Sequence, residues 1–172
     1  FHQLQLNLIF MIRYKLLLLL SLACISVAQG QRKSQPENVI ITSEGKKTRV
    51  LAGENGKLQV NVSPKDAAKF KAAGLVRYSD FGARGDGKTD DIDAIAATHA
   101  FANLHGLPVK ADNKATYYIS GKERTALIRT DTDFGKAAFI IDDSEVQNRN
   151  ASVFTVGSDL QPFKIETISS LR

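Results

Sequence analysis

The sequence predicts a mainly β domain built from short stacked strands, on the basis of three observations. A glycine-rich loop within residues 78–91 separates a short strand pattern from one alanine-rich helix pattern. Short apolar runs with polar connections then follow that helix, from residue 107 to residue 168. No second long helix pattern follows that could cover a parallel sheet, so stacked strands fit this order better than an alternating α/β fold.

The amino-terminal part of the chain, residues 1–38, is expected to lie outside the folded domain. Residues 1–10 precede the only methionine, Met11, and we interpret them as translation upstream of the true start. Residues 11–28 have the pattern of a secretory signal peptide, with two basic residues, an apolar run and small residues before the expected cleavage point. That run is shorter than the ~20 residues that a membrane-spanning helix needs. Residues 29–38 are polar and predict a linker.

The only cysteine, Cys24, lies inside the predicted signal peptide. Lipidation of Cys24 is an alternative to simple cleavage, although Ser21 stands where lipoprotein signals usually have a large aliphatic residue. If Cys24 is removed with the signal, the mature chain has no disulfide or thiolate chemistry.

The charge of the chain is moderately positive. Removing residues 1–28 takes away Arg13 and Lys15 and no acid, which lowers the formal charge from +5 to +3. Such a charge mildly favours an acidic polysaccharide as partner. Lysines and acids are mixed along the chain and form no basic run interleaved with aromatics, so nucleic acid is not an implied partner.

Residues 39–75 predict a small accessory segment of strands and one short helix. The last two of its strand patterns are joined by residues 53–56, which form a hairpin signal with a glycine at each end. Ser63 is a suitable helix N-cap, Pro64 suits the first helical position, and Gly74 suits the position just past the end. The strand patterns cover residues 39–42, 48–52 and 57–62.

The glycine-rich stretch of residues 78–91 predicts a strand that ends at Phe81, then a tight loop, then the start of a helix. Thr89 or Asp90 fits the N-cap, and the acids around it suit the positive end of the helix dipole. The helix is expected over residues 91–105. Apolar residues cover much of its circumference, which predicts that the helix is buried on more than one side.

The domain that begins at this point, residues 76–172, is expected to be incomplete. Strand patterns still recur where the sequence stops, and a stacked architecture needs about three or more units and a terminal cap. We therefore interpret this part as the amino-terminal portion of a larger domain. The strand patterns after the helix cover residues 107–111, 115–119, 126–129, 137–141, 152–156 and 163–168.

Residues 82–89 match the phosphate-binding pattern G-x-x-x-x-G-K-[ST], and the apolar run that ends at Asp142 resembles the strand that holds magnesium in nucleotide-binding proteins. In such proteins backbone amides and a helix dipole meet the phosphate oxygens. Here Asp86, Asp90 and Asp91 bring carboxylates that compete with phosphate for those amides. We therefore expect no nucleotide to bind.

Four acids close together in the sequence are candidate calcium ligands, because calcium prefers several oxygen ligands. Helix capping and turn hydrogen bonds already account for each of them, so a structural role is favoured over a metal site. These acids are Asp86, Asp90, Asp91 and Asp93.

The remaining candidates for a functional role are isolated. Asp142 and Asp143 could form a catalytic carboxylate pair, but adjacent residues of a strand point to opposite faces. His99 lies on the isoleucine face of the predicted helix and is expected to be a core residue. His105 lies at the carboxyl end of that helix, where the dipole favours a protonated imidazole. Asn150 begins an N-glycosylation sequon, which has meaning only in a eukaryotic source.

Residues 78–91, followed by Ile92-Asp-Ala-Ile95 and an alanine-rich helix, resemble the opening of right-handed parallel β-helix proteins of the pectin-lyase type. The similarity is to the pectate lyase superfamily domain of rhamnogalacturonase-like and polygalacturonase-like enzymes and some phage tailspikes. That domain opens with D-F-G-A-x-G-D-G-x-T-D-D and continues into a strand with an aromatic pair, as in residues 116–119. The match covers residues 76–121 and is absent from residues 29–75.

The resemblance implies a right-handed parallel β-helix, of which this chain holds the amino-terminal cap helix and the first coils, preceded by a signal peptide and a small α+β leader. It implies a secreted, periplasmic or cell-surface protein that acts on a pectin-like or other uronic-acid-containing glycan, by hydrolysis or elimination. Only a lyase would require calcium. The family's catalytic and calcium-binding acids come from later coils, so no residue here is predicted to be catalytic, cofactor-binding or metal-binding. A non-enzymatic glycan-binding or adhesive β-helix surface protein is the alternative.

Overall fold

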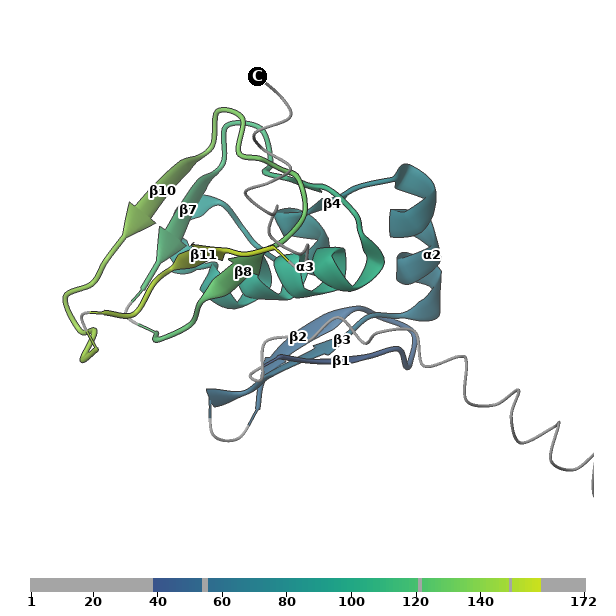
Figure 1. The fold of residues 1–172 in the computed structure, drawn as a ribbon, viewed down its shortest axis with the longest axis horizontal. Helices are drawn as coiled ribbons and strands as arrows, with labels where there is room; N and C mark the ends of the chain where they lie inside the picture. The colour runs from purple at the N-terminus through teal and green to yellow at the C-terminus, as the bar shows by residue number, and fades with distance from the viewer. Residues whose placement is uncertain (1–38, 54–55, 121, 149, 159–172) are drawn as a thin grey trace, which may run out of the picture. The chain divides into compact units, whose positions relative to one another are not determined.

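The computed structural model describes residues 39–53, 56–120, 122–148 and 150–158. The described residues form a small α/β domain with eleven short strands, two α-helices and one short 3-10 helix (Figure 1). The predicted signal peptide and linker, and the strand expected at residues 163–168, lie outside the described residues.

The helices are α2 (Pro64–Ala73), α3 (Ile92–His105) and the 3-10 helix η2 (Tyr78–Phe81). The strands are β1 (Val39–Thr42), β2 (Arg49–Ala52), β3 (Leu58–Asn61), β4 (Val76–Arg77), β5 (Asp86–Asp90), β6 (Val109–Lys110), β7 (Thr116–Ile119), β8 (Ala126–Ile128), β9 (Thr132–Asp133), β10 (Ala138–Ile141) and β11 (Phe154–Val156).

The strands fall into four small sheets, and most neighbouring strands are parallel. The first sheet has the order β1-β3-β2, in which β3 pairs parallel with β1 and antiparallel with β2. The other three sheets contain only parallel pairs and have the orders β4-β6-β9, β10-β7-β5 and β11-β8. Strands β9, β10 and β11 thus pair with the three strands that precede them along the chain, β6, β7 and β8.

The expected right-handed parallel β-helix is wrong for this structure. The described strands are two to five residues long, lie in separate sheets of two or three strands, and form neither a closed β-helix nor a solenoid. The centre of the core is a helix instead of a column of inward-facing strand residues. The expectation that α3 caps a β-helix therefore fails together with the predicted fold.

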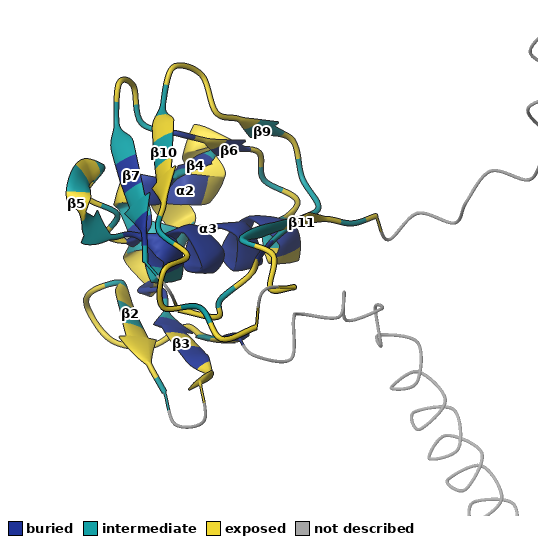
Figure 2. Ribbon diagram, turned by 90° about the vertical axis from the view of Figure 1, so that its left-hand side faces the viewer, coloured by how far each residue is buried: buried dark blue, intermediate teal, exposed yellow. Residues whose placement is uncertain are grey.

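Helix α3 is buried on almost all sides, as its apolar circumference predicted. Eleven of its fourteen residues are buried. It contacts β8, η2, β4 and β6, and on another side the sheet of β1, β2 and β3. Figure 2 shows α3 as the most continuously buried element of the described chain. Burial from several directions explains why this helix needs no polar face.

Helix α2 confirms the capping residues predicted from the sequence. The Ser63 side chain accepts a hydrogen bond from the backbone N–H of Asp66 at 3.1 Å, and Pro64 opens the helix. Gly74 ends it in the left-handed conformation, with its N–H donated to the carbonyls of Phe70 and Lys71. The predicted hairpin of β2 and β3 is confirmed as well.

The glycine-rich stretch folds differently from the prediction. Residues 78–81 form the 3-10 helix η2 instead of a strand end, and Gly82 closes it at φ 97°. Residues 86–90, expected in the loop and the helix start, form strand β5 beside β7. The N-cap of α3 is therefore Asp91 and neither Thr89 nor Asp90.

Candidate functional site

The backbone amides of the glycine-rich stretch are occupied by its own carboxylates. Asp91 accepts the N–H groups of Arg84 and Gly85 at 2.7 and 3.0 Å. Asp86 accepts the N–H groups of Lys88 and Thr89 at 2.9 and 2.7 Å. Lys88 and Thr89 also belong to strand β5 and not to a helix amino terminus. The phosphate-binding pattern therefore does not form a phosphate cradle, which agrees with the competition expected from the sequence.

The two carboxylates of this stretch differ in their electrostatics. Hydrogen bonds from Thr89 and Lys88 lower the pKa of Asp86 to about 2. Burial raises the pKa of Asp91, although the amides of Arg84 and Gly85 act in the opposite direction. Asp91 is 1% exposed, and the two hydrogen bonds from backbone N–H groups compensate for the cost of burying its carboxylate. It is a structural residue that fixes the turn.

The other two acids of the predicted cluster anchor the connection between β7 and β8. Asp90 accepts a hydrogen bond from the Ser120 hydroxyl at 2.7 Å and pairs with Lys122 at 3.0 Å. Asp93 pairs with Arg124 at 2.6 Å. In the described part of the chain, no group of three or more His, Cys, Asp or Glu residues is placed to hold a metal ion. The structural role favoured from the sequence accounts for both acids.

His99 is completely buried and contacts the Tyr78 hydroxyl through Nε2 at 2.9 Å. Its Nδ1 has no hydrogen-bond partner among the described residues. Burial lowers the pKa of His99 to about 4, so the ring is neutral at pH 7. No described pocket reaches this ring. His99 is thus a core residue, as the sequence predicted.

His105 differs from its expectation. Burial, and after it the charge of Lys71, lowers the pKa of His105, so the expected preference for a protonated ring is wrong in direction. The ring packs against Phe101 with centroids 4.4 Å apart. Burial of the ring thus favours its neutral form at this helix end.

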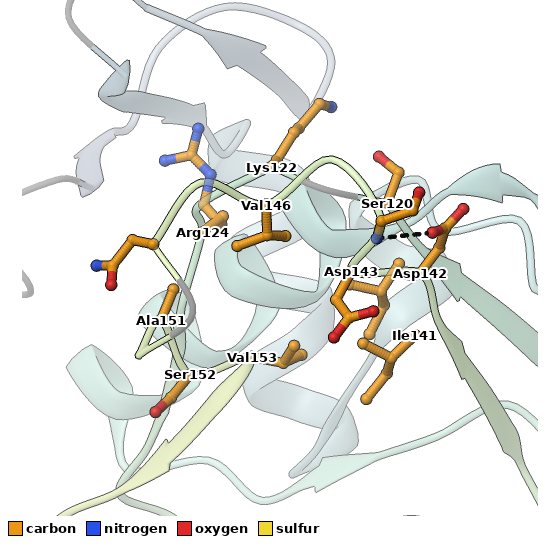
Figure 3. Close-up of a pocket in the computed structure, with 13 residues that line it drawn as sticks. Ser120, Lys122, Arg124, Ile141, Asp142, Asp143, Val146, Ala151, Ser152 and Val153 are labelled. Atoms are coloured by element: carbon orange, nitrogen blue, oxygen red, sulfur yellow. Dashed lines mark hydrogen bonds between the residues drawn. The ribbon is translucent and has the colours of Figure 1, made fainter.

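One pocket of about 470 Å³ lies beyond the ends of β7 and β10, and we name it the strand-end pocket. Figure 3 shows Asp142 and Asp143 on one side of it and Ala151 and Ser152 on the other. Its volume lies in the range of small-ligand sites. Its walls are formed by Ile119, Ser120, Lys122, Arg124, Ile141, Asp142, Asp143, Ser144, Val146, Asn148, Ala151, Ser152 and Val153.

Both members of the predicted carboxylate pair line this pocket. Strand β10 ends at Ile141, so the alternation of strand side chains does not separate Asp142 from Asp143. Asp142 is engaged, because it accepts the Ser144 N–H at 3.1 Å and the Tyr118 hydroxyl at 2.7 Å. These hydrogen bonds lower the pKa of Asp142. Asp143 is exposed, and no side-chain bond to it is found among the described residues.

The two cations of the strand-end pocket are largely committed to the protein itself. Arg124 is 10% exposed, and besides its ion pair to Asp93 it donates to the Gly56 carbonyl at 2.8 Å. Lys122 bridges Asp90 and Asp93, although half of its side chain is exposed. The Asn148 amide oxygen accepts the Asn150 N–H, and the Ser120 and Ser144 hydroxyls bond to Asp90 and Asp142. The groups left to meet a ligand are therefore Asp143, the amide nitrogen of Asn148 and the Ser152 hydroxyl.

A second hollow of about 470 Å³ was not foreseen from the sequence, and we name it the basic cleft. Its cations are separated by up to 59 positions along the chain, so no run of basic residues in the sequence indicates this cleft. Parallel pairing of β4, β6 and β9 brings them together. The basic cleft is lined by Arg77, Lys110, Ala111, Asn113, Lys114, Asp133, Gly135 and Lys136.

The glycosylation sequon lies on the surface next to the strand-end pocket. Asn150 and Ser152 are both exposed, and the Asn150 backbone N–H is donated to the Asn148 side chain at 3.1 Å. The sequon is therefore sterically accessible, and it can be glycosylated only in a eukaryotic source.

The described residues contain no helix with the length and hydropathy required to cross a membrane. A scan of protein-family models and searches of curated proteins and solved structures found no match to this chain. The candidate site therefore rests on the geometry of its own residues.

Proposed function

We propose that this chain is part of an exported polysaccharide-active protein and that its domain binds a glycan in the strand-end pocket. The observation that carries the proposal is an unengaged carboxylate beside amide and hydroxyl groups over an aliphatic surface, in a hollow of small-ligand size. The sequence resemblance of residues 76–121 supports a pectin-like or uronic-acid-containing glycan as the substrate class.

The chemistry of the strand-end pocket suits a sugar ring. A carboxylate accepts hydrogen bonds from sugar hydroxyls, an amide N–H donates to them, and a serine hydroxyl both donates and accepts. Asp143, Asn148 and Ser152 supply these groups. The aliphatic side chains of Ile141 and Val153 face the same hollow and suit the C–H face of a ring.

Export is proposed from the signal-peptide pattern of residues 11–28. A secreted, periplasmic or cell-surface location would place the domain where structural polysaccharides occur. No residue of this chain is assigned a catalytic role, since Asp142 is engaged in two hydrogen bonds and only Asp143 is left. Binding without cleavage is therefore the expected behaviour of this chain alone.

The test is isothermal titration calorimetry of the full chain with an oligogalacturonide and a neutral galacto-oligosaccharide. We expect Asp143→Asn to weaken binding by about 10- to 100-fold, the usual effect of losing a hydrogen bond to a charged group. Glu145→Gln is the matched control, because it makes the same charge change two positions away at a residue that does not line the pocket.

The proposal is overturned if neither sugar binds, or if Asp143→Asn and Glu145→Gln behave alike. Shortening of the oligosaccharide by the chain alone would instead contradict the expectation that no catalytic residue is present. Circular dichroism of each variant checks that the fold is retained.

A further inference from the structure

The basic cleft is a surface of concentrated positive charge that the strand-end pocket does not explain. Four cationic side chains and a single carboxylate line it. Arg77, Lys110 and Asp133 stand in register on three neighbouring strands, with Arg77 opposite Lys110 and Lys110 opposite Asp133. Lys114 and Lys136 come from the turns that follow β6 and β9. The turns after the neighbouring strands β6 and β9 thus each contribute one lysine to the same hollow.

Most of this positive charge is not neutralised within the protein. Lys110 pairs with Asp133 at 3.2 Å, and both side chains are about half exposed. The Arg77 guanidinium makes a long contact of 3.5 Å to the Ala111 carbonyl and shares the charge of Asp133 with Lys110, so one carboxylate serves two cations. No ion pair to Lys114 or Lys136 is found in the described part of the chain, where both residues are exposed.

Asp112, which follows the cleft residue Ala111 along the chain, is already engaged. Asp112 accepts the Ser79 hydroxyl at 2.6 Å and the Tyr117 hydroxyl at 2.8 Å. It also accepts the Ser79 N–H at 3.0 Å. Its carboxylate is held toward those groups, so it does not cancel the lysine charges of the cleft.

The backbone of Lys114 supplies a second and independent observation. Lys114 is the only described residue other than glycine with a positive φ, at 59°. A left-handed backbone conformation is unfavourable for lysine and is usually adopted by Gly, Asn or Asp. Asn113 precedes it in the same turn, yet lysine occupies the strained position. Strain of this kind collects at ligand sites, where a side chain must be presented in one direction.

We propose that the basic cleft is an anion-binding site for a polyanionic glycan that carries carboxylate or sulfate groups. Exposed ammonium and guanidinium groups bind such anions by charge-assisted hydrogen bonds. A polymer is favoured over a small anion because the four cations are spread over two strands, β4 and β6, and the two turns after β6 and β9. The inference depends on the charge and geometry of the cleft and not on the strand-end pocket.

The test measures the affinity of the full chain for polygalacturonate, dextran sulfate and uncharged dextran over a series of salt concentrations. The double variant Lys114→Gly, Lys136→Ala should bind the polyanions about ten-fold more weakly and with a shallower salt dependence. The matched control is Lys65→Ala with Lys88→Ala, which removes two exposed lysines outside the cleft and should leave affinity almost unchanged.

Asp133→Asn provides a gain of binding that loss of fold cannot imitate. It removes the only carboxylate of the cleft and frees Lys110, while the amide oxygen can still accept the Gly135 N–H seen at 2.8 Å. We expect polyanion affinity to rise several-fold. Asp143→Asn should leave it unchanged, which separates this site from the proposed sugar pocket.

The arms also identify the anionic group. Binding of dextran sulfate alone assigns sulfate, binding of polygalacturonate alone assigns carboxylate, and binding of both assigns the shared charge; each supports the site. Equal losses in the cleft variant and its lysine control would show that net charge alone acts. That result overturns the proposal. So does a failure of both polyanions to bind, or an unchanged affinity of Asp133→Asn for them.

Discussion

Acidification should destabilise this domain well before its carboxylates are protonated, because His99 is buried as a neutral ring. The ring is 0% exposed, and within the described part of the chain it bonds to the Tyr78 hydroxyl and leaves Nδ1 without a partner. Burial lowers the pKa of His99 from 6.5 to about 4. A protonated imidazolium would have to stay in a site that offers it no opposite charge, so unfolding becomes the easier way to accept the proton.

The sign and size of the effect follow from proton linkage. Between pH 6.5 and pH 4 the unfolded chain binds the His99 proton and the folded chain does not, so stability is complete above pH 6.5 and falls as the pH decreases. At pH 4.5 the loss relative to pH 7.5 is about 2.5 kcal/mol. This is a large share of the roughly 5–15 kcal/mol that stabilises a typical domain.

Other titrating groups can be separated from His99 in this window. Hydrogen bonds from Thr48 and Ser63 lower the pKa of Asp66, so its contribution is lost at lower pH. The raised pKa of Asp91 acts in the opposite sense, since its folded form gains protons more readily. The lowered pKa of His105 adds a loss of the same sign. His105→Gln therefore serves as the background in which the His99 effect is measured.

The assay is urea denaturation of the full chain at pH 7.5, 6.5, 5.5 and 4.5, followed by circular dichroism. The comparison variant adds Tyr78→Phe and His99→Leu to the same His105→Gln background, which removes both partners of the buried hydrogen bond. Its stability should change little over this pH range, while the His105→Gln background loses about 2.5 kcal/mol. A pH-independent free energy of unfolding in that background, or an equal slope in the double variant, would refute the reasoning.

The other predictions concern the turns. Gly85→Ala should destabilise the domain by about 2–4 kcal/mol, because Gly85 has a left-handed backbone and an added Cβ would lie 2.7 Å from the Cβ of Ala115. Gly135→Ala is the control, since it has the same backbone cost without the clash. Similar melting temperatures of the two variants would contradict this reasoning. Asp91→Asn should cost about 2 kcal/mol in denaturation experiments, since an amide replaces one of the two oxygens that accept backbone N–H groups, and an unchanged midpoint would argue against that role. Lys114→Gly should raise the free energy of unfolding by up to about 1 kcal/mol, seen as a higher melting temperature. A lower melting temperature would show that the left-handed lysine is not strained.

Local capping and turn chemistry was readable from the sequence because it depends on neighbouring residues. Ser63, Pro64 and Gly74 bound α2 as predicted. Gly106 ends α3 in the left-handed conformation. The all-round apolar character of α3 correctly implied burial from several sides, since no exposed face would be stable in water.

Strand β5 shows where local reasoning failed. Its sequence, Asp86-Gly-Lys-Thr-Asp90, has no apolar alternation and only one β-branched residue, Thr89. It becomes a strand because β7 offers it a hydrogen-bonding edge, and Asp86 then uses its carboxylate to fix the amides of its own loop. Pairing with a distant segment overrode local propensity.

The predicted fold class failed for a related reason. The motif of residues 78–91 and the recurring strand patterns specify short parallel strands, and these form, but they do not specify how the strands join. Four separate small sheets, three of which contact the buried helix α3, satisfy the same patterns as a continuous coil would. The motif resemblance thus exceeded what the sequence pattern alone could establish about architecture.

The sequence alone determined the boundaries of α2, the end of α3 and the burial of that helix, because these depend on contacts between near neighbours or on the period of apolar residues. Only the tertiary structure decided the strand-end pocket and the basic cleft. Arg77, Lys110 and Lys136 are far apart in the chain and meet only through the register of parallel strands. Hydrogen bonding between those strands sets that register, and no local sequence signal records it.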